Sequence, residues 1–257
     1  MRPNDQQRRS PPRSSRCTQS SRLPSTLHAN DTVGGRLAMY LSRLLLNPYS
    51  RQVKREISDP YNLHRTILRA FGSDRKAANV LHRLEINPGG FSGHSGQMML
   101  LVQSETAPDW GWLQAKEYLL PADPFSGLDN PAIKAVELAL QNGRFLQFRL
   151  RANPTIKKVR RDANGNRLNS NRVPLVHEDK QCEWLNKQAA KSGFTIIDAI
   201  IKPEGKQTGY HKKLTIYTVL INGRLQITDT TKFSTALRQG IGPAKAFGCG
   251  LLSIAPG

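Results

Sequence analysis

The chain has 257 residues, and 38 Lys and Arg against 19 Asp and Glu give it a formal net charge of +19. Such an excess of positive charge favours an acidic partner, nucleic acid above all. No apolar stretch approaches the roughly 18 residues that a membrane span requires. We therefore expect a soluble protein that binds nucleic acid.

The first 38 residues carry seven arginines, two acidic residues and little apolar surface, which predicts disorder. An Arg- and Ser-rich leader also resembles an organellar transit peptide, although it shows no clear amphipathic repeat. We favour a third interpretation, a non-native extension before a translation start at Met39, where an apolar strand pattern begins at once.

Residues 39–151 have the pattern of one βαββαβ unit. Hydrophobic periodicity predicts strands at 39–46, 79–87, 97–105 and 144–151, and helices at 59–71 and near 130–142. The link at 107–129, which holds Trp110 and Trp112, is long for a compact domain, so we expect it to pack against the domain.

Residues 152–257 repeat this order. The expected strands cover 155–160, 194–202, 212–221 and the residues after 250, and the expected helices cover 178–191 and 231–239. Asn222-Gly223 predicts a hairpin turn into a strand at 224–228. The fold class is therefore α+β, with two tandem ferredoxin-like (RRM-like) domains whose open antiparallel sheets can serve as RNA platforms.

The helix predicted at 59–71 carries the main catalytic candidate. An acidic N-cap followed by proline fixes its register. Its apolar residues then form one stripe, and His64 lies at the border between this stripe and the polar side. The polar side holds three further candidates, Tyr61, Arg65 and Arg69.

A histidine at such a border is often only a packing residue, and that alternative stays open. Imidazole, with a reference pKa of about 6.5, can also accept or donate a proton near neutral pH. RNA can be cut through its own 2′-hydroxyl, so His64 would serve as acid or base and Tyr61 would orient or share the transfer. Arg65, Arg69 and Lys245 would neutralise the charge that grows at phosphorus.

The sequence gives no sign of metal-dependent chemistry, because it has no Asp-x-Asp pair, no His-Glu-x-x-His and no clustered carboxylates. We expect no metal ion and no cofactor. His94, in a Gly-rich segment, is a secondary candidate, although an exposed turn is the simpler interpretation. The other histidines show no neighbours that indicate a site: His28, His82, His177 and His211.

A glycine-rich segment with one lysine, Lys245, precedes the last predicted strand. Glycine permits φ > 0 and close approach, so its amides can converge on a phosphate to which the lysine adds charge. The segment is not a P-loop, since no Gly-Lys-Ser/Thr follows the spacer and a strand comes next. A mobile connection packed by Phe247 is the alternative. The glycines are Gly240, Gly242, Gly248 and Gly250.

A second basic element is the hairpin predicted at 157–168, with its turn at 162–165. It is either a solvated edge ribbon whose charges block sheet pairing, or an RNA contact near the end of a stem. Its arms carry five cations, Lys157, Lys158, Arg160, Arg161 and Arg167.

The three cysteines are far apart, odd in number and without a Cys-x-x-Cys pair. We expect neither disulfides nor structural zinc. A reducing cytoplasm fits this pattern best. The cysteines are Cys17, Cys182 and Cys249.

Three segments resemble the CRISPR repeat-RNA endoribonucleases of type I-E systems, which are the CasE subunits of Cascade in the Cas6 superfamily. They are Met-Tyr-Leu-Ser at 39–42, the segment from Tyr61 to His64-Arg65, and the glycine-rich segment with its following leucines at 240–252. The resemblance extends over about residues 39–256, so the leader has no counterpart in the family.

This resemblance implies cleavage of precursor RNA on the 3′ side of repeat stem-loops, with 2′,3′-cyclic or 3′ phosphate and 5′-hydroxyl ends. The protein would stay bound to the guide RNA, with the other Cascade subunits as partners. By the same resemblance, His64 and Tyr61 are catalytic, Arg65 matches a basic position, and Arg69 stands where a lysine can occur. A non-catalytic subunit that binds RNA stem-loops and a metal-dependent nuclease remain the alternatives.

Overall fold

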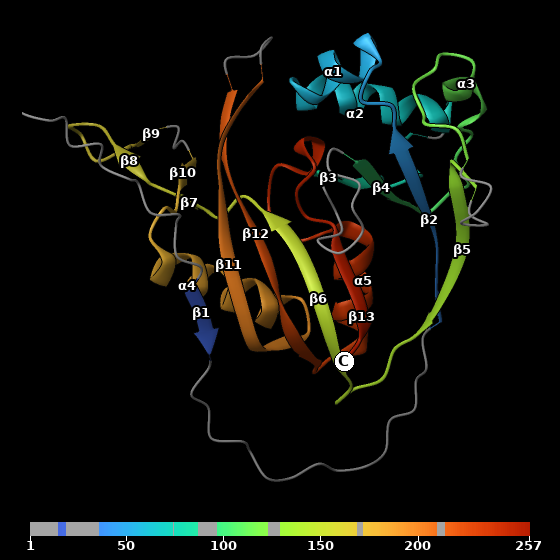
Figure 1. Ribbon diagram of the computed structural model, residues 1–257. Coiled ribbons are helices and arrows are strands. Elements are labelled where there is room, and N and C mark those ends of the chain that lie inside the picture. The colour runs from blue at the N-terminus through green and yellow to red at the C-terminus, as the bar shows by residue number, and fades with distance from the viewer. Residues whose placement is uncertain are drawn as a thin grey trace, which may run out of the picture.

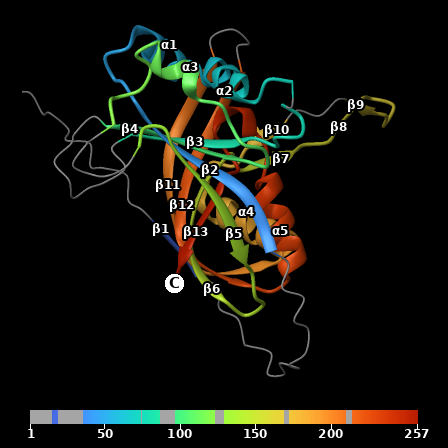
Figure 2. The ribbon, with the colours of Figure 1, turned by 90° about the vertical axis from the view of Figure 1, so that its right-hand side faces the viewer.

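The structure, a computed structural model, describes residues 15–18, 36–73, 75–86, 97–122, 129–168, 172–209 and 214–257. Figure 1 shows two sheets with helices packed on them, and Figure 2 shows the same molecule turned by 90°. Within these ranges, no helix is both long and apolar enough to cross a membrane.

The first sheet has four antiparallel strands in the order β3-β4-β2-β5, which is the ferredoxin-like order. Its strands are β2 (Arg36–Leu46), β3 (Leu81–Ile86), β4 (Met98–Ser104) and β5 (Ala132–Ala139). Its helical segments are α1 (Arg51–Ile57), α2 (Pro60–Leu68), η1 (Arg69–Phe71) and α3 (Gly111–Gln114). Leu44, Ile67 and Leu100 lie at the centre of its core.

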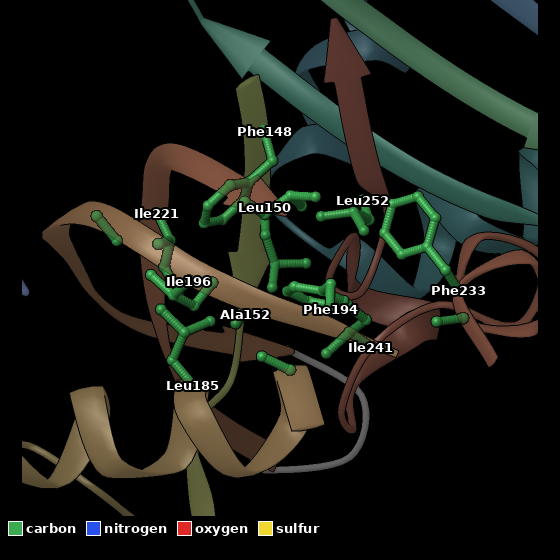
Figure 3. Packing of buried hydrophobic residues seen from close by; sticks show 14 of the residues in the cluster. Phe148, Leu150, Ala152, Leu185, Phe194, Ile196, Ile221, Phe233, Ile241 and Leu252 are labelled. Carbon is green, nitrogen blue, oxygen red and sulfur yellow. The ribbon is translucent and has the colours of Figure 1, made fainter. Parts of the chain in front are cut away.

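The second sheet has five strands in the order β1-β11-β12-β6-β13, and without β1 it repeats the ferredoxin-like order. Its strands are β1 (Ser15–Thr18), β6 (Phe145–Ala152), β11 (Phe194–Gly209), β12 (Leu214–Ile227) and β13 (Leu252–Pro256). Helices α4 (Glu178–Lys191) and α5 (Thr230–Gln239) accompany it. Figure 3 shows its core, in which Leu150, Phe194 and Leu252 pack together. Two tandem ferredoxin-like domains are thus confirmed.

The predicted division between the two units is wrong in its details. Residues 132–139, expected to be helical, form β5, which pairs along β2 from Arg43 to Arg36. This pairing outweighs the helix propensity of a segment rich in Ala, Glu and Leu. The strand at 145–152, expected to close the first sheet, pairs instead with β12 and β13. The sheets therefore separate before residue 145, and not at residue 151.

The link after β4 packs against the first domain, as the sequence predicts. Trp110 is buried, and its indole nitrogen donates a hydrogen bond to Ser42 Oγ of β2 at 3.0 Å. Leu113 of α3 is buried beside it in the same core. The short α3 takes the chain position at which a ferredoxin-like unit has its second helix.

Gly223 does not form the expected hairpin turn, because β12 continues through it. A Cβ atom at Gly223 would lie 2.1 Å from the carbonyl oxygen of Asp198 on β11. The pairing of β11 with β12 shifts register between Ile196 and Asp198. The glycine therefore permits a close approach of two backbones at a bulge.

A small basic ribbon leads out of the second sheet. Strand β8 pairs with β9, which confirms the predicted hairpin, and β7 pairs with β10 at its base. Figures 1 and 2 both show this ribbon extending away from the two sheets. The strands are β7 (Thr155–Lys157), β8 (Arg160–Arg161), β9 (Arg167–Leu168) and β10 (Arg172–Pro174).

The structure contradicts one expectation about the N-terminal residues and one about the cysteines. Ser15–Thr18 form β1, which pairs with β11, so disorder is wrong for these four residues. Residues 1–14 and 19–35, with His28, lie outside the described ranges, and the start at Met39 stays a prediction. Cys182 is disulfide-bonded, which contradicts the expectation of no disulfide, whereas Cys249 is free and buried.

Candidate active site

Helix α2 begins as the sequence predicts and presents His64 at the border of its buried face. The side chain of Asp59 accepts a hydrogen bond from the Tyr61 amide at 3.1 Å and so caps the helix. Leu63 and Ile67 are buried in the core of the first domain. His64, between the buried and exposed sides, is half-buried.

The two segments that the sequence singles out meet in the structure. Helix α2 contacts η2 (Lys245–Phe247), the 3₁₀ turn inside the glycine-rich segment. Figure 1 shows this red C-terminal segment beneath α2. A histidine helix from the first domain and a lysine-bearing loop from the second therefore form one region.

His82 of β3 belongs to this region, although the sequence gives no sign of it. Its ring stacks on that of His64, with centroids 5.5 Å apart and an angle of 20° between the planes. Within the described residues, the Nδ1 atoms of both rings are buried and have no hydrogen-bond partner. A Cβ atom at Gly248 would lie 3.7 Å from the His82 ring, so the glycine-rich loop also adjoins it.

Both imidazoles favour the neutral form. Burial lowers the pKa of His64 from its ordinary value. Burial, then the charges of His64 and Arg151, lower the pKa of His82 to about 3. Near pH 7, His64 is therefore a neutral base that can accept a proton.

The stability of the protein should fall as the pH falls below the unfolded-state pKa of His82, about 6.5. Between this value and about 3 the unfolded state binds more protons at residue 82 than the folded state does. The free energy of unfolding then decreases by up to about 1.4 kcal/mol per pH unit. Urea unfolding from pH 4 to 7 measures this slope. His82→Gln should reduce this slope by up to about 1.4 kcal/mol per pH unit, the contribution of one proton. An unchanged slope would contradict burial of a neutral His82.

The expected amide cradle is not available at three of the four glycines. The amides of Gly240, Gly248 and Gly250 donate hydrogen bonds to backbone carbonyl groups at 2.8, 3.1 and 2.8 Å. These three glycines have a structural role, because their positive φ angles allow the turns of the loop. A Cβ atom at Gly240 would also lie 2.8 Å from Leu81 Cδ2. Gly242 has a similar structural role, since its Cβ would lie 2.8 Å from the Trp184 ring.

The position of Lys245 is compatible with the expected electrostatic role, which stays a prediction. It is the first residue of η2, at the contact with α2, and it is half-buried. Burial lowers the pKa of its ammonium group. A half-buried cation on a turn that contacts the helix of a neutral imidazole suits a reaction in which negative charge grows on a phosphate.

Arg65 and Arg69 do not gather around this contact. Both line a separate hollow of about 810 Å³ between α1, α2 and the residues after η1. The guanidinium carbon of Arg69 lies 4.4 Å from the centroid of the Trp112 ring. Both arginines lie further around α2, and their expected role at the scissile phosphate stays a prediction.

The cations of the hairpin form a third, distinct region. Lys157, Lys158 and Arg161 are exposed on the ribbon, and Arg160 lies on β8. Figures 1 and 2 show that the ribbon lies apart from α2. These residues remain candidates for a contact with RNA and not for the chemistry.

A cleft of about 600 Å³ opens between the domains beside His82 and Gly248. Arg149 and Arg151 of β6 line it, at the period of two by which a strand places residues on one face. Glu85 and Glu204 pair with these arginines at 2.9 and 2.6 Å. The sequence shows the alternation of these arginines, but not the cleft that they line.

Other expectations have no test in the structure. Residues 87–96, which include His94, and residues 210–213, which include His211, lie outside the described ranges. Among the described residues, no three His, Cys, Asp or Glu side chains come together in a way that would hold a metal ion. The absence of a metal from the reaction stays a prediction.

Tandem ferredoxin-like domains that bring a neutral histidine and a half-buried lysine to one contact define a basic α+β protein suited to phosphate chemistry. The chain belongs to the family described as CRISPR associated protein, whose model matches residues 39–256. This match and the resemblance found in the sequence cover the same part of the chain.

The relatives and solved structures agree with this assignment. The chain is 33% identical over 237 residues to the CRISPR-associated endoribonuclease Cse3 of Thermus thermophilus, covering 85% of this chain and 100% of the relative. It is 42% identical over 129 residues to the Cascade subunit CasE of Escherichia coli K12, covering 48% of this chain and 64% of the relative.

Two solved structures share the fold. Thermus thermophilus Cse3 bound to an RNA that represents a pre-cleavage complex has a TM-score of 0.67 at 30% identity, covering 85% of this chain and 99% of that one. Cas6e of Escherichia coli K-12 has a TM-score of 0.56 at 30% identity, covering 84% and 99%.

Proposed function

We propose that this protein is an endoribonuclease that cleaves CRISPR precursor RNA on the 3′ side of repeat stem-loops without a metal ion. It then remains bound to the guide RNA among the other subunits of Cascade, in the cytoplasm. The contact between α2, the helix that carries His64, and the lysine-bearing turn η2 supports this proposal. The names of its relatives, an endoribonuclease and a Cascade subunit, support it.

The chemistry starts from the neutral form of His64. Its imidazole removes the proton of the 2′-hydroxyl, and the 2′ oxygen attacks the adjacent phosphorus. Lys245 stabilises the negative charge that grows on the phosphate oxygens. The bond to the 5′ oxygen breaks, and this oxygen takes a proton from Tyr61 or Lys245. The products are a 2′,3′-cyclic phosphate and a 5′-hydroxyl.

The pH dependence of cleavage tests the role of His64 as base. Burial places its pKa below 6.5, so kcat/KM should rise with pH through this lowered pKa and be level by pH 7. Single-turnover rates with EDTA present, from pH 4.5 to 8, measure the profile. Circular dichroism at each pH shows that the protein is folded. A rate that falls over the same range would make His64 the acid.

The affinity for RNA should decrease with salt. Each phosphate that the protein neutralises contributes about 0.7 to 0.9 to the slope of log K against log salt. Filter binding of a repeat hairpin between 50 and 200 mM NaCl measures this slope. Replacing Lys157, Lys158 and Arg161 by Gln should reduce it, whereas Lys134→Gln on β5 should not. A flat response in the parent protein would contradict an electrostatic contact.

The non-catalytic alternative, a subunit that only binds RNA stem-loops, keeps the same fold and the same cations. It differs in that His64 would be a packing residue. A cleavage assay with chelator separates the two functions, because only the proposed one gives products with a 5′-hydroxyl end.

A further inference from the structure

The hollow that contains Arg65 and Arg69 is strongly basic and lies outside the contact of α2 with η2. It has a volume of about 810 Å³, and every residue that lines it belongs to the first domain. Five of its residues are cations, Arg55, Arg65, Arg69, Arg75 and Lys116.

The acidic side chain that lines the hollow does not offset these charges at the surface. Glu56 is buried, and its carboxylate accepts hydrogen bonds from the Tyr118 hydroxyl at 2.7 Å and from Gln52 Nε2 at 2.9 Å. Within the described part of the chain, Arg55, Arg65 and Arg69 form no ion pair. The hollow therefore presents positive charge that an anionic ligand can neutralise.

An indole ring holds two of the cations at one side of the hollow. The Trp112 ring lies 4.4 Å from the guanidinium carbon of Arg69 and 5.6 Å from Nζ of Lys116. Arg75 Nε donates a hydrogen bond to the carbonyl of Gly72 at 2.9 Å. These contacts limit the freedom of the side chains and so reduce the entropy that binding would cost.

The hollow lies further around α2 from His64. Successive residues of an α-helix are about 100° apart around its axis. Around the more exposed side of α2, Tyr61 therefore lies beside His64, and Arg65 lies beyond Tyr61. His64 stacks on β3, whereas Arg65 lines the hollow. An RNA strand that crosses α2 at His64 therefore passes Tyr61 and then lies against these arginines.

Resting on the proposed function, we propose that this hollow binds the phosphodiester backbone of the single-stranded RNA that continues on the 3′ side of the scissile bond. The basic hairpin and η2, which we expect to contact the RNA stem, both belong to the second domain. The stem would therefore lie on the side of α2 that faces this domain, and the hollow would be free for the RNA beyond the scissile bond. Arginine guanidinium groups bind phosphate oxygens through paired hydrogen bonds without reading bases. The site therefore recognises a strand and not a sequence.

The test compares two repeat hairpins, both made uncleavable by a 2′-deoxy sugar at the scissile nucleotide. One ends a single nucleotide beyond this position, and the other carries six more nucleotides on its 3′ side. The parent protein should bind the extended RNA more tightly. The double variant Arg55→Gln, Arg75→Gln should weaken the extended RNA about tenfold and leave the short one unchanged. Lys134→Gln with Arg144→Gln, exposed cations elsewhere in the chain, is the matched control.

Three results would overturn the assignment of the hollow. They are equal affinity of the parent protein for both RNAs, equal weakening of both by the double variant, and no weakening of either. Cleavage of the ribose hairpin at saturating concentration should be unchanged in the double variant. If the parent protein cleaves no hairpin, the proposed function is wrong, but the two binding curves still decide what the hollow binds.

Discussion

His64→Ala should lower the rate of repeat-hairpin cleavage by about 10²- to 10⁴-fold, the range typical of one proton-transfer group. The imidazole is half-buried and neutral, and it belongs to α2, the helix that contacts η2. The affinity for the hairpin should stay nearly unchanged, because the cations that we expect to bind RNA are elsewhere. Single-turnover cleavage and filter binding of the same RNA measure the two effects separately.

A matched control for this substitution lies on the same helix. Asn62→Ala changes a polar residue of α2 that bonds to Asp59 at 3.2 Å and should leave the cleavage rate within a few-fold of the parent. Thermal unfolding of each variant shows that the fold persists. Cleavage by His64→Ala at the parental rate would make His64 a packing residue and favour the non-catalytic alternative.

The second large effect concerns the free energy of unfolding. Arg83 of β3 is 2% exposed and pairs with Glu85 at 2.8 Å. Its guanidinium also donates hydrogen bonds to β13 and its approach, at the Leu251 carbonyl (3.2 Å) and Ser253 Oγ (3.0 Å). This one side chain therefore joins the two domains beside the proposed site.

Arg83→Met should reduce the free energy of unfolding by about 3 kcal/mol, since it removes one partner of a buried ion pair and leaves acceptors unpaired. Glu85 keeps Arg149 as a partner at 2.9 Å, which limits the loss. Urea unfolding measures the change, with Arg144→Met, an exposed arginine, as the control. A reduction no greater than that of the control would contradict the role of Arg83 between the domains.

Local signals in the sequence predict three of the helices, α2, α4 and α5. An acidic N-cap, a proline and an apolar stripe give α2 its start and its buried face, and apolar periodicity gives the bounds of α4 at 178–191. These features depend on neighbours three or four residues away. They do not depend on the rest of the fold.

Strand partners are set by residues far away in the chain. The segment that becomes β5 is rich in helix formers, but its antiparallel pairing with β2 stabilises the extended form. Gly223 resembles a turn glycine until the carbonyl of Asp198 is placed beside it. The position of β6 in the second sheet likewise follows from its pairing with β12 and β13.

The candidate site divides in the same way. The capped helix predicts His64 at a border, and the sequence resemblance relates it to the glycine-rich segment. The stacking of His82 on His64 joins two elements that are not neighbours in the chain, and no sequence motif predicts this contact. The amides of the glycine-rich loop also differ from expectation, because hydrogen bonds within the protein occupy those of Gly240, Gly248 and Gly250.

Cleavage of one repeat hairpin in EDTA, with either ribose or 2′-deoxyribose at the scissile nucleotide, tests the central claim most directly. The account predicts that the ribose hairpin is cut to a 2′,3′-cyclic phosphate and a 5′-hydroxyl, and that the deoxy hairpin stays intact. Cleavage of the deoxy hairpin, or loss of all activity in EDTA with recovery in Mg²⁺, would contradict attack by the 2′-hydroxyl without a metal.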